Sequence, residues 1–200
     1  MSKNWSLILV VAFTLGYGLK LFLENAPETT PTAETKTIAT FSGENNQVVD
    51  LYDLNDSRVR VAYFGFTHCP DVCPTSLAML SAALKQLDDK TLATIRPVFI
   101  TLDPERDDAN GAHQYAQYFH PSIEGLSAPL TITKPIAEKY GVVFKKTELT
   151  DSQLKYTIDH NSYFYLLQPN GQLITKVPHT LNPAPIVAAI EKIQETNPKE

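Results

Sequence analysis

The sequence has little positive charge, and its basic residues are scattered rather than clustered. Lysine and arginine together number 17, against 22 aspartates and glutamates, which gives a formal net charge of −5. Nucleic-acid-binding domains carry a clustered basic surface that neutralises phosphates. A function in nucleic-acid binding is therefore excluded.

Cysteine is also scarce, and the only two cysteines are Cys69 and Cys73. The chain lacks a second C-x-x-C pair that would complete a structural zinc site, and the spacing of its own pair is not the C-x-x-C of a thiol oxidoreductase. A disulfide between residues four apart closes a very small loop and adds little stability. These absences favour a chemical role for the pair over the alternative, a structural disulfide.

Long hydrophobic runs are missing except for one, at residues 5–23. This run is about as long as a bilayer is thick, and the stem of Lys20, the one charge in it, can reach towards the headgroups. It predicts a transmembrane anchor, with residues 1–4, including Lys3, in the cytoplasm and the rest translocated. A cleaved signal peptide is the alternative, although no clear A-x-A site follows the run.

A second full domain is also not expected in 200 residues of which 43% are hydrophobic, and no internal repeat is present. Residues 24–37 (ENAPETTPTAETKT) have almost nothing to bury and predict a flexible linker. The sequence therefore predicts one folded domain over residues 38–200.

The first half of this domain alternates strand and helix patterns. Residues 59–64 and 95–102 are rich in β-branched and aromatic side chains and predict buried strands. Residues 75–88 and 108–119 predict helices, the first because leucines recur three and four positions apart. Such a β-α-β unit implies parallel strands with a right-handed crossover.

The second half predicts a hairpin and a terminal helix. Pro169-Asn170-Gly171 is a strong turn signal between two strand patterns. A β-α-β unit followed by a hairpin and a helix is the thioredoxin arrangement, an α/β fold with a central mixed β-sheet flanked by helices. The elements predicted in addition to the β-α-β unit are an N-terminal β-hairpin at 41–54, a short helix at 135–140 closed by Gly141, a short strand at 142–145, hairpin strands at 163–167 and 173–177, and a helix at 183–196.

The two cysteines lie between the first buried strand and the first helix. Binding groups in α/β sheets gather beyond the carboxyl ends of the strands, and this is such a position. Cys69 and Cys73 each precede a proline, so the helix is expected to begin after Cys73. At a helix N-terminus the macrodipole and free N–H groups stabilise thiolates, which favours metal binding or thiol exchange.

Four segments together resemble the Sco/SenC family of cytochrome oxidase assembly proteins. Residues 63–75 (YFGFTHCPDVCPT) are similar to the family signature, and residues 101–107 (TLDPERD) to its second motif. The pair Gly125-Leu126 resembles its short turn, and residues 156–163 (YTIDHNSY) its histidine segment. The resemblance covers residues 38–195 and implies a thioredoxin-like fold.

The resemblance also implies a copper site formed by Cys69, Cys73 and His160. Without the family resemblance, His160 would be interpreted as an ordinary loop histidine. Two soft thiolates and one imidazole suit Cu(I) and can also hold Cu(II). Asp159 is expected to orient His160, whereas His68 is expected to point away from the site because consecutive residues do not share a direction.

The implied role is assembly of the binuclear CuA centre of cytochrome c oxidase subunit II. The predicted location is the inner membrane, as a single-pass protein with the folded domain in the periplasm or the equivalent intermembrane space. Another periplasmic copper chaperone is a further expected partner. These expectations make the chain a copper metallochaperone.

Two enzymatic alternatives remain open. In the first, Cys69 and Cys73 are the redox-active pair of a thiol-disulfide reductase that keeps the CuA-site cysteines reduced. His160 discriminates between this function and copper binding, because a reductase does not require it. The second, a peroxiredoxin-like peroxidase, depends on Thr67 before Cys69, but the usual threonine spacing is not reproduced.

Overall fold

The computed structural model describes residues 13–17, 20 and 39–196 of the chain. The chain divides into two compact units, Met1–Thr37 and Ile38–Glu200. The described residues of the first unit are helical. Across the described parts of the chain, no helix is both long and apolar enough to cross a membrane. Most of the predicted anchor and all of the predicted linker lie outside the described residues.

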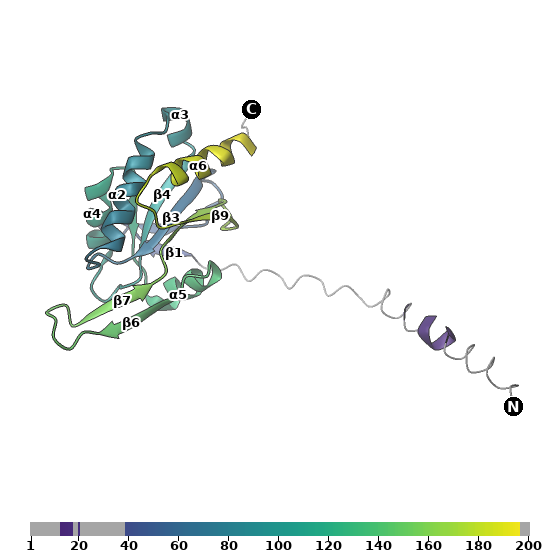
Figure 1. Ribbon diagram of the computed structural model, residues 1–200, viewed down its shortest axis with the longest axis horizontal. Helices are drawn as coiled ribbons and strands as arrows, with labels where there is room; N and C mark the ends of the chain where they lie inside the picture. Colours follow the sequence, from purple (N-terminus) through teal and green to yellow (C-terminus); the bar gives the residue numbers. More distant parts are fainter. Residues whose placement is uncertain (1–12, 18–19, 21–38, 197–200) are drawn as a thin grey trace, which may run out of the picture. The chain divides into compact units, whose positions relative to one another are not determined.

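The second unit is built on a five-stranded mixed sheet, drawn in Figure 1, with the strand order β5-β4-β3-β8-β9. The strands β3, β4 and β5 run parallel, while β8 is antiparallel to β3, and β9 to β8. The mixed sheet predicted from the sequence is therefore confirmed, with β5 as an additional edge strand. The strand bounds are β3 Val59–Gly65, β4 Ile95–Thr101, β5 Glu124–Leu126, β8 Tyr163–Leu167 and β9 Leu173–Pro178.

The two central strands are buried along their whole length. Every residue of β3 and of β4 is buried. Strands that are buried along their whole length are typical of sheets covered on both faces. Their sequences are mostly apolar, with Arg60, Arg96 and Thr101 as buried polar exceptions, which explains why they predict strands well. The helices of the domain are α2 Val72–Leu84, α3 Asp89–Leu92, α4 Ala109–Phe119, α5 Leu130–Lys139 and α6 Ala184–Thr196.

Two small hairpins lie outside the main sheet. The first pairs β1 (Thr40–Ser42) with β2 (Val48–Asp50) around the 3-10 turn η1 (Glu44–Asn46), which confirms the predicted N-terminal hairpin. The second pairs β6 (Phe144–Glu148) with β7 (Tyr156–His160) and projects from the lower end of the domain in Figure 1.

The β6–β7 hairpin is longer than the sequence predicted. Only a short strand at 142–145 was expected, and β7 was missed. The reason is that Ile158 is the one buried residue of the two strands. A mostly exposed, charged hairpin gives no apolar run from which a strand can be predicted.

The start of α2 also differs from the prediction. The helix begins at Val72, so Cys73 lies in its first turn rather than before it. Pro74 is tolerated there because the first N–H groups of a helix have no partner within the helix. At the other end, α2 stops at Leu84, and Asp88 caps α3 by accepting a hydrogen bond from the backbone of Thr91.

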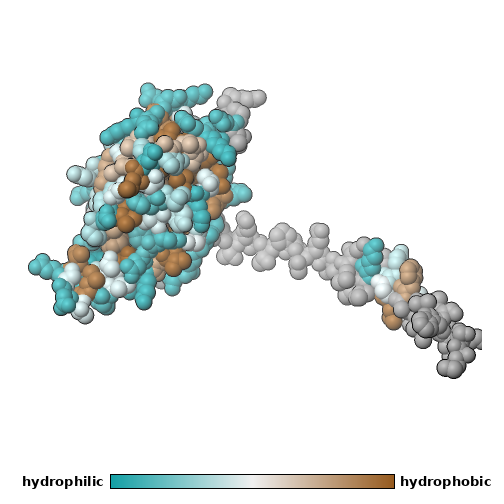
Figure 2. All heavy atoms as spheres, in the orientation of Figure 1, coloured by the Kyte–Doolittle hydropathy of each residue, from teal (hydrophilic) through white to brown (hydrophobic). Residues whose placement is uncertain are grey.

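The surface of the domain carries both hydrophobic and hydrophilic side chains. On the face shown in Figure 2, hydrophobic residues lie in small groups between hydrophilic ones. The largest exposed hydrophobic side chains of the domain include Tyr118, which is 85% exposed, and Leu181, which is 77% exposed.

Candidate metal centre

The two cysteines lie where β3 passes into α2. Cys69 is half-buried and Cys73 is fully buried, and both are free thiols. The backbone N–H of Cys73 donates to the Sγ of Cys69 at 3.4 Å. The first turn of α2 thus directs an N–H group at the outer sulfur, as the sequence predicted for a helix N-terminus.

His160, the last residue of β7, reaches the inner cysteine. Its Nε2 atom lies 3.5 Å from the Sγ of Cys73. On the other side of the ring, Nδ1 lies 3.1 Å from the carbonyl oxygen of Asn161. An Nδ1–H that donates to this carbonyl leaves the lone pair on Nε2, which faces the sulfur. The imidazole is therefore oriented to offer Nε2 as a ligand.

The spacing of these two atoms suits a shared metal ion. Ligand bonds of about 2.3 Å to sulfur and 2.0 Å to nitrogen, at a near-tetrahedral angle, place the two donors roughly 3.5 Å apart. Cys73 and His160 have this separation. In the described part of the chain no group of three or more histidine, cysteine or acidic side chains is already arranged as a complete ligand set. Cys69 is linked to Cys73 and His160 through the hydrogen bond that its Sγ accepts from the backbone N–H of Cys73.

The protonation states of the three groups differ because their surroundings differ. Hydrogen bonding with Cys73 lowers the pKa of Cys69 to about 5 and outweighs the opposing effect of burial. The same interaction with Cys69, together with burial, raises the pKa of Cys73. Burial lowers the pKa of His160. At neutral pH the site therefore combines one thiolate, one thiol and one neutral imidazole.

Asp107 fixes the loop that carries Cys69, a role that sequence reasoning missed. Its carboxylate accepts hydrogen bonds from the backbone N–H and the hydroxyl of Thr67, at 2.9 and 2.5 Å, and from the hydroxyl of Thr101 at 2.7 Å. The only sequence signal was its place at the end of the segment TLDPERD. His68 points towards Thr67 and Asp107 rather than into the site, as predicted.

Gly65, the last residue of β3, leaves room for the buried thiol. A Cβ atom at this position would lie 2.9 Å from the Sγ of Cys73 and 2.9 Å from the ring of Tyr63. The absence of a side chain therefore allows the sulfur to pack directly against the strand.

The expectation that Asp159 orients His160 is wrong. The Asp159 carboxylate accepts a hydrogen bond from the hydroxyl of Thr147 at 2.6 Å. Consecutive residues of a strand point to opposite faces, so Asp159 faces outwards when His160 faces the cysteines. The main chain of Asn161 takes the place that Asp159 was expected to fill.

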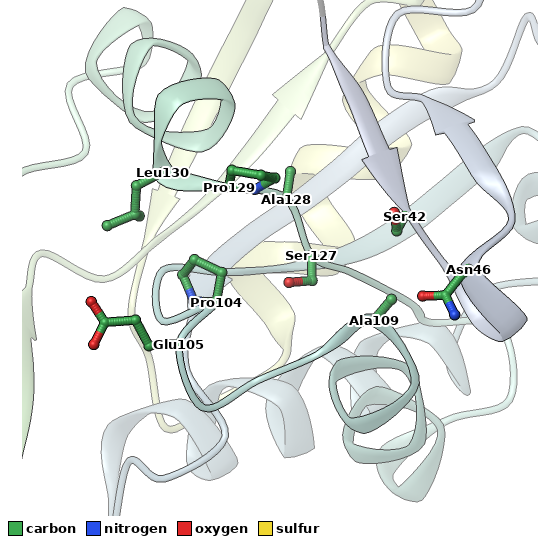
Figure 3. A pocket seen from close by; sticks show the side chains of 9 residues that line it. All are labelled: Ser42, Asn46, Pro104, Glu105, Ala109, Ser127, Ala128, Pro129 and Leu130. Carbon is green, nitrogen blue, oxygen red and sulfur yellow. The ribbon is translucent and has the colours of Figure 1, made fainter.

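A pocket of about 490 Å³ lies apart from the three predicted ligands, beside the turn that follows β4 (Figure 3). In Figure 3 Leu130 stands at one end, with Ser42 and Asn46 at the other. The residues that line it are Ser42, Asn46, Pro104, Glu105, Ala109, Ser127, Ala128, Pro129 and Leu130.

Comparison with known sequences identifies relatives. A model of the SCO1/SenC family matches residues 28–195. The mitochondrial protein SCO2 of Saccharomyces cerevisiae is 38% identical over 141 residues, which are 70% of this chain and 47% of that protein. The mitochondrial SCO1 homolog 1 of Arabidopsis thaliana is 42% identical over 114 residues, 57% of this chain and 34% of that protein. The chain thus spans about half, or less, of the length of these curated relatives.

Solved structures share the fold. The crystal structure of Arabidopsis thaliana ScoI with copper bound has a TM-score of 0.70 at 31% identity, and covers 78% of this chain and 96% of that chain. Yeast Sco1 with copper bound has a TM-score of 0.67 at 30% identity, covering 80% and 93% respectively. The predicted α/β fold is therefore confirmed as the thioredoxin-like fold of Sco proteins. Because the family model matches far more than half of its residues, the chain belongs to the SCO1/SenC family.

Proposed function

We propose that this chain is a copper metallochaperone that binds copper through Cys69, Cys73 and His160. The observation that carries the proposal is the 3.5 Å separation of the Cys73 Sγ and His160 Nε2 atoms, next to a Cys69 thiol whose pKa is lowered to about 5. Thiolate and imidazole donors suit Cu(I), and the same set can hold Cu(II). The relatives from Arabidopsis and yeast whose structures contain copper support this choice of metal.

The recipient that we propose is the binuclear CuA centre of cytochrome c oxidase subunit II. Delivery requires that the metal can leave, and three protein ligands leave room for an incoming one. Cys69 is half-buried, whereas Cys73 is fully buried. An incoming thiolate can therefore approach on the Cys69 side and replace that ligand first.

The proposed setting is the outer face of an inner membrane. The predicted anchor at residues 5–23 and linker at 24–37 would hold the domain in the periplasm, or in the intermembrane space of a mitochondrion. Another copper chaperone of that compartment would supply the metal. The apolar length of the run supports the anchor, and two relatives are named as mitochondrial proteins.

A copper titration of the purified full-length chain tests the proposal. Under argon and in reducing buffer, we expect about one Cu(I) per chain, and the Cu(II) form should show thiolate charge-transfer absorption. His160→Ala should weaken binding and change the spectrum. His68→Ala is the matched control, because His68 contacts Thr67 and Asp107 instead of the cysteines. Equal binding by His160→Ala and wild type would refute the ligand set.

A second function, reduction of the CuA-site cysteines, is favoured by the unequal pKa values of the cysteine pair. The Cys69 thiolate is the nucleophile, and the buried Cys73 thiol is the resolving group. Cys69 would attack the substrate disulfide to form a mixed disulfide, and Cys73 would then release the substrate dithiol and leave a Cys69–Cys73 disulfide. This activity should survive in His160→Ala, whereas copper binding should be weakened.

A further inference from the structure

A tight turn at residues 103–107 follows directly after β4. The backbone N–H groups of Arg106 and Asp107 both donate to the carbonyl of Asp103, at 3.1 and 2.9 Å. The residues Asp103 and Asp107 are only 3% and 1% exposed. Buried carboxylates require hydrogen-bond partners, and here the partners come from two distant parts of the chain.

One carboxylate of the turn holds the cysteine side of the site. Asp107 receives hydrogen bonds from both the backbone and the hydroxyl of Thr67, two residues before Cys69. The same carboxylate receives a bond from Thr101 at the end of β4. The cysteine loop is thereby tied to the turn and to the central sheet.

The other carboxylate holds the histidine side. The hydroxyl of Tyr156, at the start of β7, donates to Asp103 at 2.8 Å, and the Nε of Arg106 donates to the other oxygen of Asp103 at 2.5 Å. The Arg106 guanidinium lies 3.7 Å from the centre of the Tyr156 ring, and its Nη1 donates to the carbonyls of Leu154 and Tyr156, each at 3.1 Å.

A lysine of β6 also contacts both Tyr156 and the turn at residues 103–107. The Lys146 ammonium lies 3.8 Å from the centre of the Tyr156 ring and 2.7 Å from a carboxylate oxygen of Glu105. The Tyr156 ring therefore contacts two cations, and each of them is paired with an acid of the turn. Both strands of the hairpin are in this way attached to residues 103–107.

Apart from these contacts with residues 103–107, little fixes the position of the β6–β7 hairpin at the end that carries Tyr156. A two-stranded hairpin is at best marginally stable alone, and Ile158 is the one residue of β6 and β7 that is buried. Tyr156, Ile158 and His160 alternate along β7 and point to the same face. At the far end, the Asn161 side chain is held by the backbone of Val143 and Gly141. Tyr156 and His160 are thus the two ends of one strand and lie on the same face of it.

We propose that residues 103–107 form a clamp that holds the cysteine loop and the β6–β7 hairpin in one fixed arrangement, with Arg106 and Tyr156 as positioning residues for His160. The inference rests on the proposed function, in which His160 is a copper ligand. Loosening the clamp moves the hairpin and withdraws His160, which leaves the metal on the two cysteines and open to transfer. The clamp thereby sets how firmly the copper is held.

Two variants of the full-length chain test the clamp. Tyr156→Leu removes the hydroxyl and the ring, and Arg106→Gln removes the cation and its bonds to the hairpin backbone. Lys145→Gln is the matched control, because Lys145 is an exposed residue of the same hairpin that points to the opposite face from Lys146. Hydrogen exchange in the copper-free, reduced protein measures how firmly the hairpin is held when no metal is bound.

We expect faster exchange at residues 144–160 in both variants, with unchanged exchange in β3 and β4. Cu(I) affinity should fall by about 10- to 100-fold, the usual effect of losing a group that orients a ligand. The Cu(II) spectrum should shift towards that of His160→Ala, which a general loss of stability would not produce. The control should match wild type in all three measurements.

Unchanged exchange in the hairpin of both variants would overturn the clamp. Faster exchange with wild-type copper affinity and spectrum would also overturn it, because His160 would then be positioned by other contacts. A wild-type chain that binds no copper would instead refute the proposed function. In that case the exchange measurement alone decides whether the clamp holds the hairpin.

Discussion

The Nε2 atom of His160 lies 3.5 Å from the Sγ of Cys73, although 87 residues separate them in the sequence. The cysteine follows the central strand β3, and the histidine lies just before β8, the antiparallel neighbour of β3. The pairing of these two strands therefore creates the site. A local motif supplies both sulfur atoms of the site, and the nitrogen comes from a segment that is distant in the sequence.

The reactivity of Cys69 should depend on pH in an unusual range. In the copper-free, reduced protein, its alkylation rate should be half-maximal near pH 5, because hydrogen bonding with Cys73 lowers its pKa to about that value. In Cys73→Ala the midpoint should rise towards the ordinary thiol value of about 8.5. Mass spectrometry of Cys69 labelled at a series of pH values provides the measurement. The same midpoint in both proteins would show that Cys73 does not stabilise the thiolate.

Loss of either sulfur should abolish both chemistries of the pair. Cys69→Ser and Cys73→Ser should each weaken Cu(I) binding by more than the about 10- to 100-fold typical of losing an orienting group. Neither variant can form the intramolecular disulfide, which His160→Ala should still form. Competition titrations and thiol counts after mild oxidation measure the two effects. A serine variant that retained tight Cu(I) would contradict the ligand assignment.

Asp56 should stabilise the fold above acid pH. Burial raises its pKa, but hydrogen bonds from the side chain and backbone of Arg58 and the positive charges of Arg58 and Arg60 outweigh burial and lower it to about 2. A carboxylate with a lowered pKa stabilises the folded state above its unfolded pKa of about 4, and this stabilisation disappears as the pH falls through the folded pKa.

Asp56→Asn should therefore lower the free energy of unfolding at pH 7 by about 1 kcal/mol, after allowance for solvent screening. The difference from wild type should shrink between about pH 4 and pH 2. Urea denaturation at several pH values gives the result. A difference that stays constant down to pH 2 would mean that the negative charge of Asp56 is not its source.

Gly125 should tolerate no side chain. A Cβ atom there would lie 2.1 Å from the carbonyl oxygen of Ala112 and 2.4 Å from the Cα of His113. Gly125→Ala should therefore cost about 3 kcal/mol or more, because β5 must move away from α4. Gly111→Ala is the control, since its Cβ would meet only the Asp108 side chain, at 3.1 Å. In thermal unfolding, Gly125→Ala should have a clearly lower melting temperature than Gly111→Ala. Equal melting temperatures would refute the close approach of β5 to α4.

The central strands and the cysteine loop were predictable because their signals are local. β3 and β4 are buried throughout, so their sequences are mostly apolar. The cysteines lie where a strand passes into a helix, and that position predicts a stabilised thiolate. The prediction holds for Cys69, whose pKa is lowered to about 5, but not for Cys73, whose pKa is raised.

Other parts of the site depend on contacts that no local pattern reveals. The β6–β7 hairpin is mostly exposed and is positioned by Tyr156 and Arg106, so its extent could not be predicted from periodicity. His160 was found only through the family resemblance, because a single histidine carries no spacing signal. The role of Asp107 arises when Thr67, 40 residues earlier, folds against it.

The position of β3 between β4 and β8 has a consequence for the order of events in folding. Cys69 and Cys73 are close in sequence and can meet in an unfolded chain, so oxidation of the pair does not require the native state. His160 reaches Cys73 only after β3 and β8 have paired, which is a slow, long-range step. A disulfide can therefore form before the chain folds, whereas the complete set of one nitrogen and two sulfurs exists only afterwards. A metal that requires all three donors would bind the finished fold selectively and stabilise it by mass action.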